Sequence, residues 1–314
     1  MKRLLLILIA LATLSGCNVV RLMEKRADRS FRKAGLEPHT FHDGSGLRSV
    51  WSTSNTAKPD LVLIHGITAR ASMWSKNVKR LSSHFDLILP ELIGHGRTTV
   101  TWSGNSIDAQ VAHVHTLLDS LERREQLFVV GNSYGGAIAA NYAEQHPERV
   151  KGLIIYDGPA SDYTGEMADS IARSVGAEDV RDLFTPQNAD EQQRLISLSV
   201  HKKLVLPRFV LRQINDHMKI RQAEHLALLD DLLRHEDEYS SKRYHWSMPV
   251  HVLWGEDDRL IPVCVGEGIA RRNSLGEDRL LKVPEAGHVS NIEQARVFES
   301  LLLRAFRPEG SDPD

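Results

Sequence analysis

The chain is short of cysteine, of net charge and of long hydrophobic runs, and each shortage excludes a class of protein. Cys17 and Cys264 are its only cysteines, so a small fold held by several disulfide bonds is excluded. The 39 basic and 41 acidic side chains are intermixed along most of the chain, which leaves no basic patch for nucleic acid. With 41% hydrophobic and 25% charged residues, the 314 residues suit one large globular domain or a domain with an insertion.

Short motifs of metal and nucleotide sites are missing as well. The chain contains no H-E-x-x-H and no C-x-x-C, and its 15 histidines are scattered. It contains neither a phosphate-binding P-loop nor a dinucleotide-binding G-x-G-x-x-G. We therefore expect neither a metal nor a cofactor.

The first residues have the pattern of a secretory signal peptide. Lys2 and Arg3 precede an apolar run over residues 4–14, and small residues follow it. The run is well short of the roughly 20 residues that a membrane-spanning helix needs. A lasting transmembrane anchor is therefore not expected.

The end of that run, Leu14-Ser15-Gly16-Cys17, resembles the lipobox of bacterial lipoproteins. The resemblance implies that residues 1–16 are removed and that Cys17 is acylated, which attaches the protein to a membrane and leaves Cys264 as a free thiol. Asn18 after the cysteine implies sorting to the outer membrane, with the folded domain in the periplasm or at the cell surface. A plain signal peptide that contains a cysteine is the alternative.

Residues 17–38 are predicted to form a tether that mixes basic and apolar side chains. Two alternatives stay open for it. The tether is an amphipathic basic helix on the membrane surface, or a segment with a solvated charged face. Its basic residues are Arg21, Lys25, Arg26, Arg29, Arg32 and Lys33.

Beyond the tether, short apolar runs alternate with helical stretches, which predicts an α/β fold with a mostly parallel sheet covered by helices on both faces. Most runs are dense in Val, Leu and Ile without alternation, as in strands buried on both faces. A hairpin over residues 39–53 is expected to turn at residues 43–46. The candidate strands cover residues 61–66, 85–91, 127–132, 152–158, 250–255 and 279–288.

This alternation fails between about residues 160 and 246, where the pattern is helical and amphipathic, as at residues 224–235. We expect a core of residues 39–159 and 247–310 and a helical cap of residues 160–246 that packs on one edge of the sheet. The cap is either a lid over a site or a plain helical layer.

Chemically active residues follow several predicted strands, at the carboxyl ends where an open parallel sheet binds its ligands. Ser133 follows the third strand, Asp258 the fifth and His288 the sixth. A serine hydroxyl needs an adjacent base, which a neutral histidine can supply. That histidine needs a carboxylate on its other ring nitrogen. These three residues are the predicted nucleophile, acid and base.

Four segments in chain order resemble the α/β-hydrolases, whose triad runs serine, acid, histidine. The resemblance covers nearly all of the chain from about residue 40 and implies the α/β-hydrolase fold, with the helical cap as an insertion. Glu91 departs from the pattern, because relatives have aspartate there, at a generally structural position. The segments are HGITARASMW (65–74), PELIGHGRT (90–98), GNSYGG (131–136), and LWGEDDRLIP (253–262) with EAGH (285–288).

The acid has three candidates. The family pattern G-x-x-D-x-x-x-P matches Gly255, Asp258 and Pro262, which favours Asp258 over Asp257. Asp157, at the end of the fourth strand, is the fallback.

Backbone N–H groups of Ile67 and Tyr134 are expected to form the oxyanion hole. His65 is expected to order that loop, and His95 to be structural. Glu293 either holds the loop after His288 or is a solvated acid at a helix start.

A serine at this turn argues against the dehalogenase and epoxide hydrolase members of the family, which use aspartate there. Ester hydrolysis through an acyl-serine is the predicted reaction, and the segments look most similar to bacterial family V lipases and the monoacylglycerol lipase group. A lipid-like ester is thus the expected substrate, with no nucleic acid as partner. Alternatives are a carbon-carbon hydrolase of ring-cleavage products, amide or thioester cleavage, and a non-catalytic envelope lipoprotein.

Overall fold

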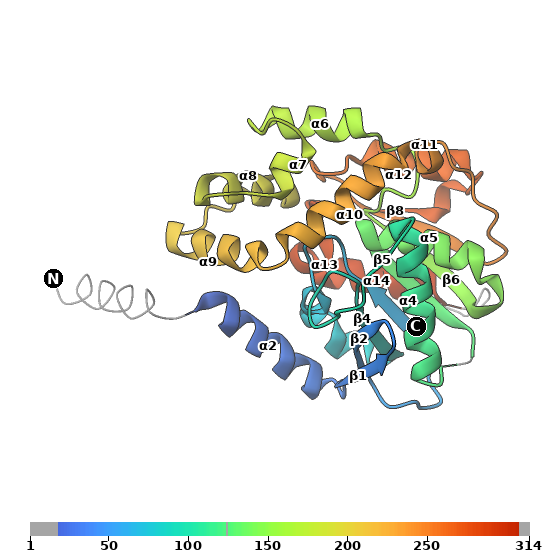
Figure 1. Ribbon diagram of the computed structural model, residues 1–314. Coiled ribbons are helices and arrows are strands. Elements are labelled where there is room, and N and C mark those ends of the chain that lie inside the picture. Colours follow the sequence, from blue (N-terminus) through green and yellow to red (C-terminus); the bar gives the residue numbers. More distant parts are fainter. Residues whose placement is uncertain (1–17, 124, 308–314) are drawn as a thin grey trace.

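The computed structural model describes residues 18–123 and 125–307 (Figure 1). The predicted signal peptide and Cys17 lie outside the described residues. The described residues form an eight-stranded sheet with the order β1-β2-β4-β3-β5-β6-β7-β8. The strands are β1 Glu37–Asp43, β2 Gly46–Ser52, β3 Asp60–Ile64, β4 Asp86–Glu91, β5 Leu127–Asn132, β6 Val150–Tyr156, β7 Val250–Gly255 and β8 Leu280–Val283.

Only the first two strands run antiparallel to their neighbours. β1 and β2 form the predicted hairpin, in which Asp43 pairs with Gly46, and the strands from β4 to β8 pair in parallel. The mostly parallel sheet predicted from the sequence is therefore confirmed, as are its six candidate strands. The last one is shorter than predicted, because Pro284 has no N–H to donate and Glu285 adopts a φ of 51°.

Helices cover both faces of the sheet. On one face α4 (Ser106–Ser120), α5 (Tyr134–Gln145) and α12 (Val263–Arg272) bury their apolar sides, and on the other η1 (Ala71–Lys76), α3 (Val78–Leu81) and α14 (Ala295–Ala305) do so. Alternate residues of one strand supply both cores: Val62 belongs to the first and Leu63 to the second. The remaining short helices of this part are η2 Pro147–Arg149, η3 Glu277–Arg279 and α13 Ser290–Glu293.

The chain between β6 and β7 is helical, as the sequence predicts, and its helices lie together over one end of the sheet (Figure 1). They are α6 Gly165–Ser174, α7 Val180–Phe184, α8 Ala189–Ser199, α9 Arg208–Lys219, α10 Gln222–Arg234 and α11 Glu236–Tyr239. We call this segment the cap.

Helix α2 (Val19–Lys33) occupies most of the predicted tether. The Asn18 side chain caps it by accepting a hydrogen bond of 2.8 Å from the N–H of Arg21. Its apolar side packs on the folded core, where the Phe31 ring meets Trp51 at 5.1 Å between centroids. At the other end, the N–H of Val19 donates to Gln213 of cap helix α9 at 2.6 Å. The helix therefore joins the start of the described chain to the cap.

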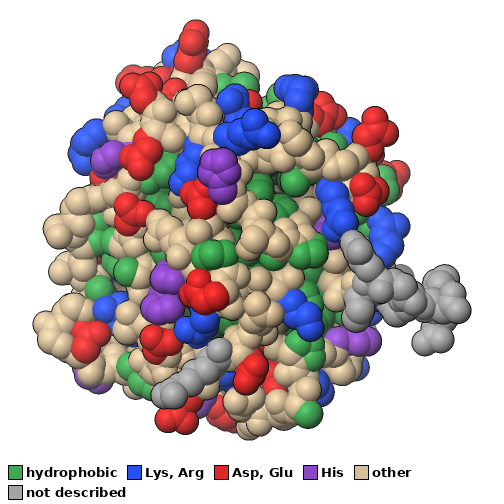
Figure 2. All heavy atoms as spheres, turned by 90° about the vertical axis from the view of Figure 1, so that its right-hand side faces the viewer, with side chains coloured by type: hydrophobic (Ala, Val, Ile, Leu, Met, Phe, Trp, Pro, Cys, Tyr) green, Lys and Arg blue, Asp and Glu red, His purple; other side chains and the backbone are tan. Residues whose placement is uncertain are grey.

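The surface in Figure 2 carries basic and acidic side chains interspersed with one another. This distribution matches the near-zero net charge of the chain, and it offers no large field of one sign on the described part of this face. Within residues 18–123 and 125–307, no helix is both long and apolar enough to cross a bilayer.

Candidate active site

Ser133 occupies the sharp turn between β5 and α5. Its backbone has a φ of 55° and a ψ of −125°, a strained conformation for a residue with a side chain. Glycines make the turn possible: a Cβ at Gly131 would overlap the carbonyl group of Gly135, and one at Gly135 would lie 2.5 Å from the carbonyl oxygen of His65. The turn leaves the Ser133 side chain on the wall of a cavity.

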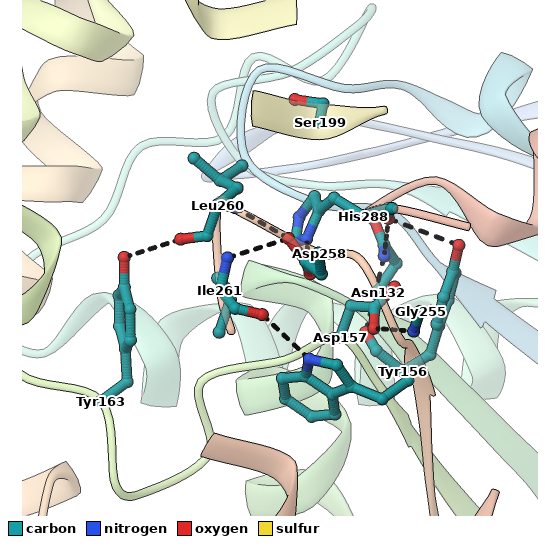
Figure 3. Close-up of polar contacts among 12 residues, drawn as sticks. Asn132, Tyr156, Asp157, Tyr163, Ser199, Gly255, Asp258, Leu260, Ile261 and His288 are labelled. Carbon is teal, nitrogen blue, oxygen red and sulfur yellow. Dashed lines mark hydrogen bonds and ion pairs between the residues drawn. The ribbon is translucent and has the colours of Figure 1, made fainter. Parts of the chain in front are cut away.

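His288 and Asp258 meet at the carboxyl ends of β8 and β7 (Figure 3). The Nδ1–H of His288 donates to Oδ2 of Asp258 at 2.7 Å, and both side chains are buried. Because the carboxylate only accepts, the proton lies on Nδ1 and Nε2 keeps a free lone pair. The other carboxylate oxygen accepts from the N–H groups of Leu260 and Ile261 at 2.9 and 3.0 Å.

The serine turn and the histidine loop are also connected directly. The Asn132 side chain, next to Ser133, donates to the carbonyl oxygen of His288 at 3.4 Å (Figure 3). The Tyr156 hydroxyl donates to Oδ1 of Asn291 at 3.0 Å and lies 3.4 Å from the same carbonyl oxygen of His288. The structure thus places the predicted nucleophile, acid and base after the carboxyl ends of β5, β7 and β8, at the same end of the sheet.

The two other candidate acids are placed differently. Asp257 points outward, with a side chain 48% exposed, and its Oδ2 lies 2.8 Å from Nδ1 of His201. Asp157 is fully buried, and its Oδ1 accepts from the N–H of Gly255 at 2.9 Å. Burial and the neighbouring Asp258 carboxylate raise the pKa of Asp157 well above its usual range, which favours its neutral form. Of the three candidates, Asp258 is the one that accepts the hydrogen bond of His288.

Asp157, Asp258 and His288 are also the one group of three potential metal ligands that gathers within the described residues, with ligand atoms within 4.8 Å of one another. The pairing of the predicted acid and base explains why these side chains lie close together, because Nδ1 of His288 and Oδ2 of Asp258 are already hydrogen-bonded to each other.

Ile67 and Tyr134, the predicted oxyanion donors, line the same cavity as Ser133. Tyr134 is the first residue of α5, so its N–H has no acceptor within the helix. The loop before Ile67 approaches the turn closely, since a Cβ at Gly66 would lie 2.9 Å from the Ser133 Cβ. Both N–H groups therefore belong to segments that flank the serine.

The buried His65 ring holds this loop through two hydrogen bonds. Its Nδ1–H donates to the carbonyl oxygen of Gly66 at 2.8 Å, and its Nε2 accepts from the N–H of Leu92 at 3.2 Å. Burial lowers the pKa of His65 to about 3, so the ring is neutral and both bonds persist at physiological pH.

Glu91, the residue that departs from the family pattern, lies buried beside His65. Its Oε2 is 3.6 Å from the His65 Nε2 and its Oε1 is 3.9 Å from Nε of Arg70. Burial raises the pKa of Glu91 to about 7. Gly96 provides the room that the longer acid needs, because a Cβ there would lie 2.5 Å from Oε2.

The cavity at Ser133 has a volume of about 100 Å³ and lies between the core and the cap. Its walls are almost entirely apolar, with Tyr163 hydrogen-bonded through its hydroxyl to the carbonyl oxygen of Leu260 at 3.1 Å (Figure 3). Such a space suits a hydrocarbon chain. The apolar side chains that the cap contributes include Phe184, Leu229, Leu232 and Leu233.

A cap segment, residues 197–201, binds the residues beside the acid and the base. Arg259 donates to the carbonyl oxygens of Ser197 and Val200 at 2.7 and 2.6 Å. The Glu293 carboxylate accepts from the N–H of Gly287 at 2.8 Å and from that of His201 at 3.0 Å. Glu293 thus holds the loop before His288, whereas nothing in the sequence marked His201 or Arg259.

Comparison with known proteins agrees with this geometry. Monoacylglycerol lipase abhd6-A of Xenopus laevis is 25% identical over 78% of this chain and 74% of its own length. Lipase 1 of Psychrobacter immobilis is 24% identical over 93% of both chains.

Solved structures share the fold at lower identity. A bacterial membrane phospholipase A superposes with a TM-score of 0.75, at 21% identity, over 98% of this chain and all (100%) of its own. The 2-hydroxy-6-oxo-6-phenylhexa-2,4-dienoate hydrolase of Rhodococcus superposes at 0.74, with 18% identity, over 87% of this chain and 99% of its own. The family model of the alpha/beta hydrolase fold matches residues 59–295. The chain therefore belongs to the α/β-hydrolase fold family, as a hydrolase of the lipase and esterase type.

Proposed function

We propose that the protein is a membrane-anchored serine hydrolase that cleaves carboxylic esters, of the acylglycerol or another lipid-like type, through an acyl-serine intermediate. The observation that carries the proposal is the buried hydrogen bond of 2.7 Å between His288 and Asp258, which follow β8 and β7, at the same end of the sheet as the turn after β5 that presents Ser133. The apolar cavity at Ser133 supports an acyl chain as the part of the substrate that binds there.

The proposed reaction uses each group in turn. Oγ of Ser133 attacks the ester carbonyl carbon while Nε2 of His288 takes its proton, and Asp258 stabilises the imidazolium. The N–H groups of Ile67 and Tyr134 receive the negative charge on the carbonyl oxygen. His288 then protonates the departing alcohol, and a water molecule activated by the same nitrogen releases the acid and restores the serine.

The membrane anchor rests on the lipobox resemblance of Cys17, and the described surface supports it. Most of the large exposed hydrophobic side chains lie on α2 or directly flank α9, which α2 contacts. A lipid on Cys17 would hold this edge of the molecule at the membrane, because α2 begins only two residues later. These side chains are Met23, Leu204, Val205 and Ile220.

Activity is tested on protein that lacks residues 1–17. We expect hydrolysis of p-nitrophenyl esters and covalent labelling by a fluorophosphonate, both abolished by Ser133→Ala. Absence of both in the parent protein would refute the hydrolase proposal, and labelling that survives Ser133→Ala would refute the nucleophile.

The anchor is tested separately in the full-length chain. Cys17→Ser should abolish metabolic labelling with palmitate and release the protein from membranes. Labelling that persists in Cys17→Ser would overturn the lipidation site without affecting the proposed reaction.

A further inference from the structure

Helix α2 holds the end of residues 65–70, which we call the oxyanion loop, and the short helix that follows it. The Arg70 side chain donates from Nη1 to the carboxylate of Glu24 in α2. Ser30 of α2 donates from Oγ to the carbonyl oxygen of Ser75 in η1 at 2.7 Å. A helix on the outside of the molecule (Figure 1) therefore contacts the chain directly at the oxyanion loop.

The oxyanion loop contains a strained turn. Thr68 has a φ of 60°, a left-handed conformation that is rare for a β-branched residue. It directly follows Ile67, a predicted oxyanion donor. The turn is closed by a hydrogen bond of 3.2 Å from the N–H of Ala69 to the carbonyl oxygen of Gly66. Such a conformation persists only where the surrounding structure holds the chain in place.

Different groups hold the two sides of this turn. Before the turn, the His65 ring bonds to the carbonyl oxygen of Gly66. After the turn, Arg70 lies between two carboxyl groups, because its Nε is 3.9 Å from Oε1 of Glu91 while its Nη1 donates to Glu24. Burial raises the pKa of Glu91 to about 7, so this group is only partly ionised near neutral pH. Glu24 thus supplies negative charge that Glu91 provides only in part.

The Glu24 side chain is carried on a helix that is itself fixed. Ala27 and Phe31 lie three and seven residues further along α2, on the same face of the helix, and both are buried. The Glu24 Oε1 also lies 3.6 Å from Nε2 of His217 in α9. The packing of α2 therefore sets the position of the Glu24 carboxylate, and with it that of Arg70.

We propose that Glu24 is a positioning residue, which acts through Arg70 on the oxyanion loop. The ion pair holds the strained turn at Thr68 in place and so keeps the N–H of Ile67 directed at the carbonyl oxygen of the ester. This inference rests on the proposed function, in which that N–H group receives the developing negative charge. It makes α2, predicted from the sequence as a tether, a part of the catalytic domain, and it links the predicted anchor at Cys17 to the reaction.

The test is Glu24→Gln in the full-length chain, because glutamine keeps the shape of the side chain and removes its charge. Loss of an entire oxyanion donor lowers kcat by about 10²–10³-fold, and a misaligned donor loses part of that effect. We expect Glu24→Gln to lower kcat on p-nitrophenyl butyrate by about tenfold. The value of KM should stay within about twofold, because the donor acts on charge that develops in the transition state.

A double variant tests the route through Arg70. Arg70→Gln should lower kcat about as much as Glu24→Gln does. The double variant should lower kcat little further, because both changes break the same contact. Losses that multiply in the double variant would overturn the route through Arg70.

A transition-state analogue reports on the oxyanion hole directly. With an alkyl trifluoromethyl ketone, Oγ of Ser133 adds to the carbonyl carbon, His288 takes the hydroxyl proton, and the oxygen anion that forms occupies the hole. The inhibition constant should rise about tenfold in Glu24→Gln. Asp28→Asn removes an exposed carboxylate from the same helix, one turn further on, and should change neither kcat nor the inhibition constant.

An ion pair that only held α2 on the core would give a different result. A lower midpoint of thermal unfolding with unchanged kcat and inhibition constant, or equal losses in Asp28→Asn, would overturn the positioning role. Ester hydrolysis by the wild-type protein would then still stand. A wild-type protein that turns over no ester would instead refute the proposed function, and the positioning role with it.

Discussion

Replacing Asp258 by asparagine should nearly abolish turnover while leaving the fold intact. Asp258 accepts three hydrogen bonds, from the N–H groups of Leu260 and Ile261 and from Nδ1–H of His288. The asparagine amide oxygen can still serve the two backbone donors. Its NH₂ group then faces His288, which must turn Nδ1 into an acceptor and move its proton to Nε2.

That tautomer change removes the base, because a protonated Nε2 cannot take the proton of Ser133. We expect Asp258→Asn to lower kcat on a p-nitrophenyl ester by about 10⁴-fold, as in other triads, which corresponds to about 5.5 kcal/mol of transition-state stabilisation. The assay is kcat at pH 8, with the thermal unfolding midpoint as the check that the isosteric variant is folded.

Two neighbouring aspartates serve as matched controls. Asp257→Asn removes only an exposed contact to His201 and should change kcat by less than about threefold. Asp157→Asn should also change kcat only mildly, because burial already favours the neutral form of the Asp157 carboxyl group and the amide that replaces it is neutral too. If Asp258→Asn kept more than a tenth of the activity, or either control lost as much as Asp258→Asn does, the assignment of the acid would be refuted.

Three further predictions test the surroundings of the triad. Glu293→Ala leaves the N–H groups of Gly287 and His201 without their acceptor. We expect kcat to fall about tenfold and the free energy of unfolding to fall by about 1–3 kcal/mol. An unchanged kcat would contradict a positioning role of Glu293. The pKa of Glu91 is raised to about 7 in the folded state, so the contribution of the protonated carboxyl group to stability is lost as pH rises from about 4.5 through 7. The free energy of unfolding of Glu91→Gln in urea should therefore rise relative to that of the wild type by up to about 3 kcal/mol between pH 5 and 8. A difference between the two proteins that stays constant over this pH range would contradict the raised pKa. Gly131→Ala should destabilise by about 3 kcal/mol and abolish fluorophosphonate labelling, because its methyl group would overlap Gly135; a labelled, stable variant would show that the turn can relax.

The sheet, its hairpin and the serine turn could be predicted because their signals are local. Runs of Val, Leu and Ile mark strands buried on both faces, and Gly131 and Gly135 mark a turn in which these two positions have no room for a Cβ. The three candidate residues could be proposed from the sequence because the carboxyl ends of parallel strands converge, and because the family pattern G-x-x-D-x-x-x-P favoured Asp258 over Asp257.

Features that depend on packing between distant segments could not be predicted. His95 and His225 are 130 residues apart, and only the docking of α10 on the loop after β4 brings their rings to 4.6 Å. The basic pattern of α2 fitted a helix on a membrane surface and a solvated tether equally well. The packing of α2 on the core could not be predicted, because the contact of Phe31 with Trp51 depends on the position of the β1–β2 hairpin. Neither pairing leaves a pattern in the sequence.

The contacts of the cap bear on whether it is a lid or a fixed layer. Its segment 197–201 binds Arg259, next to the acid, and through Glu293 binds Gly287, next to the base. Lifting this segment would break those hydrogen bonds and release both loops that hold the Asp258–His288 pair. We therefore propose that this edge of the cap is a fixed layer that holds the two loops of the predicted acid and base, and that an opening for the ester occurs elsewhere along the cap, away from residues 197–201.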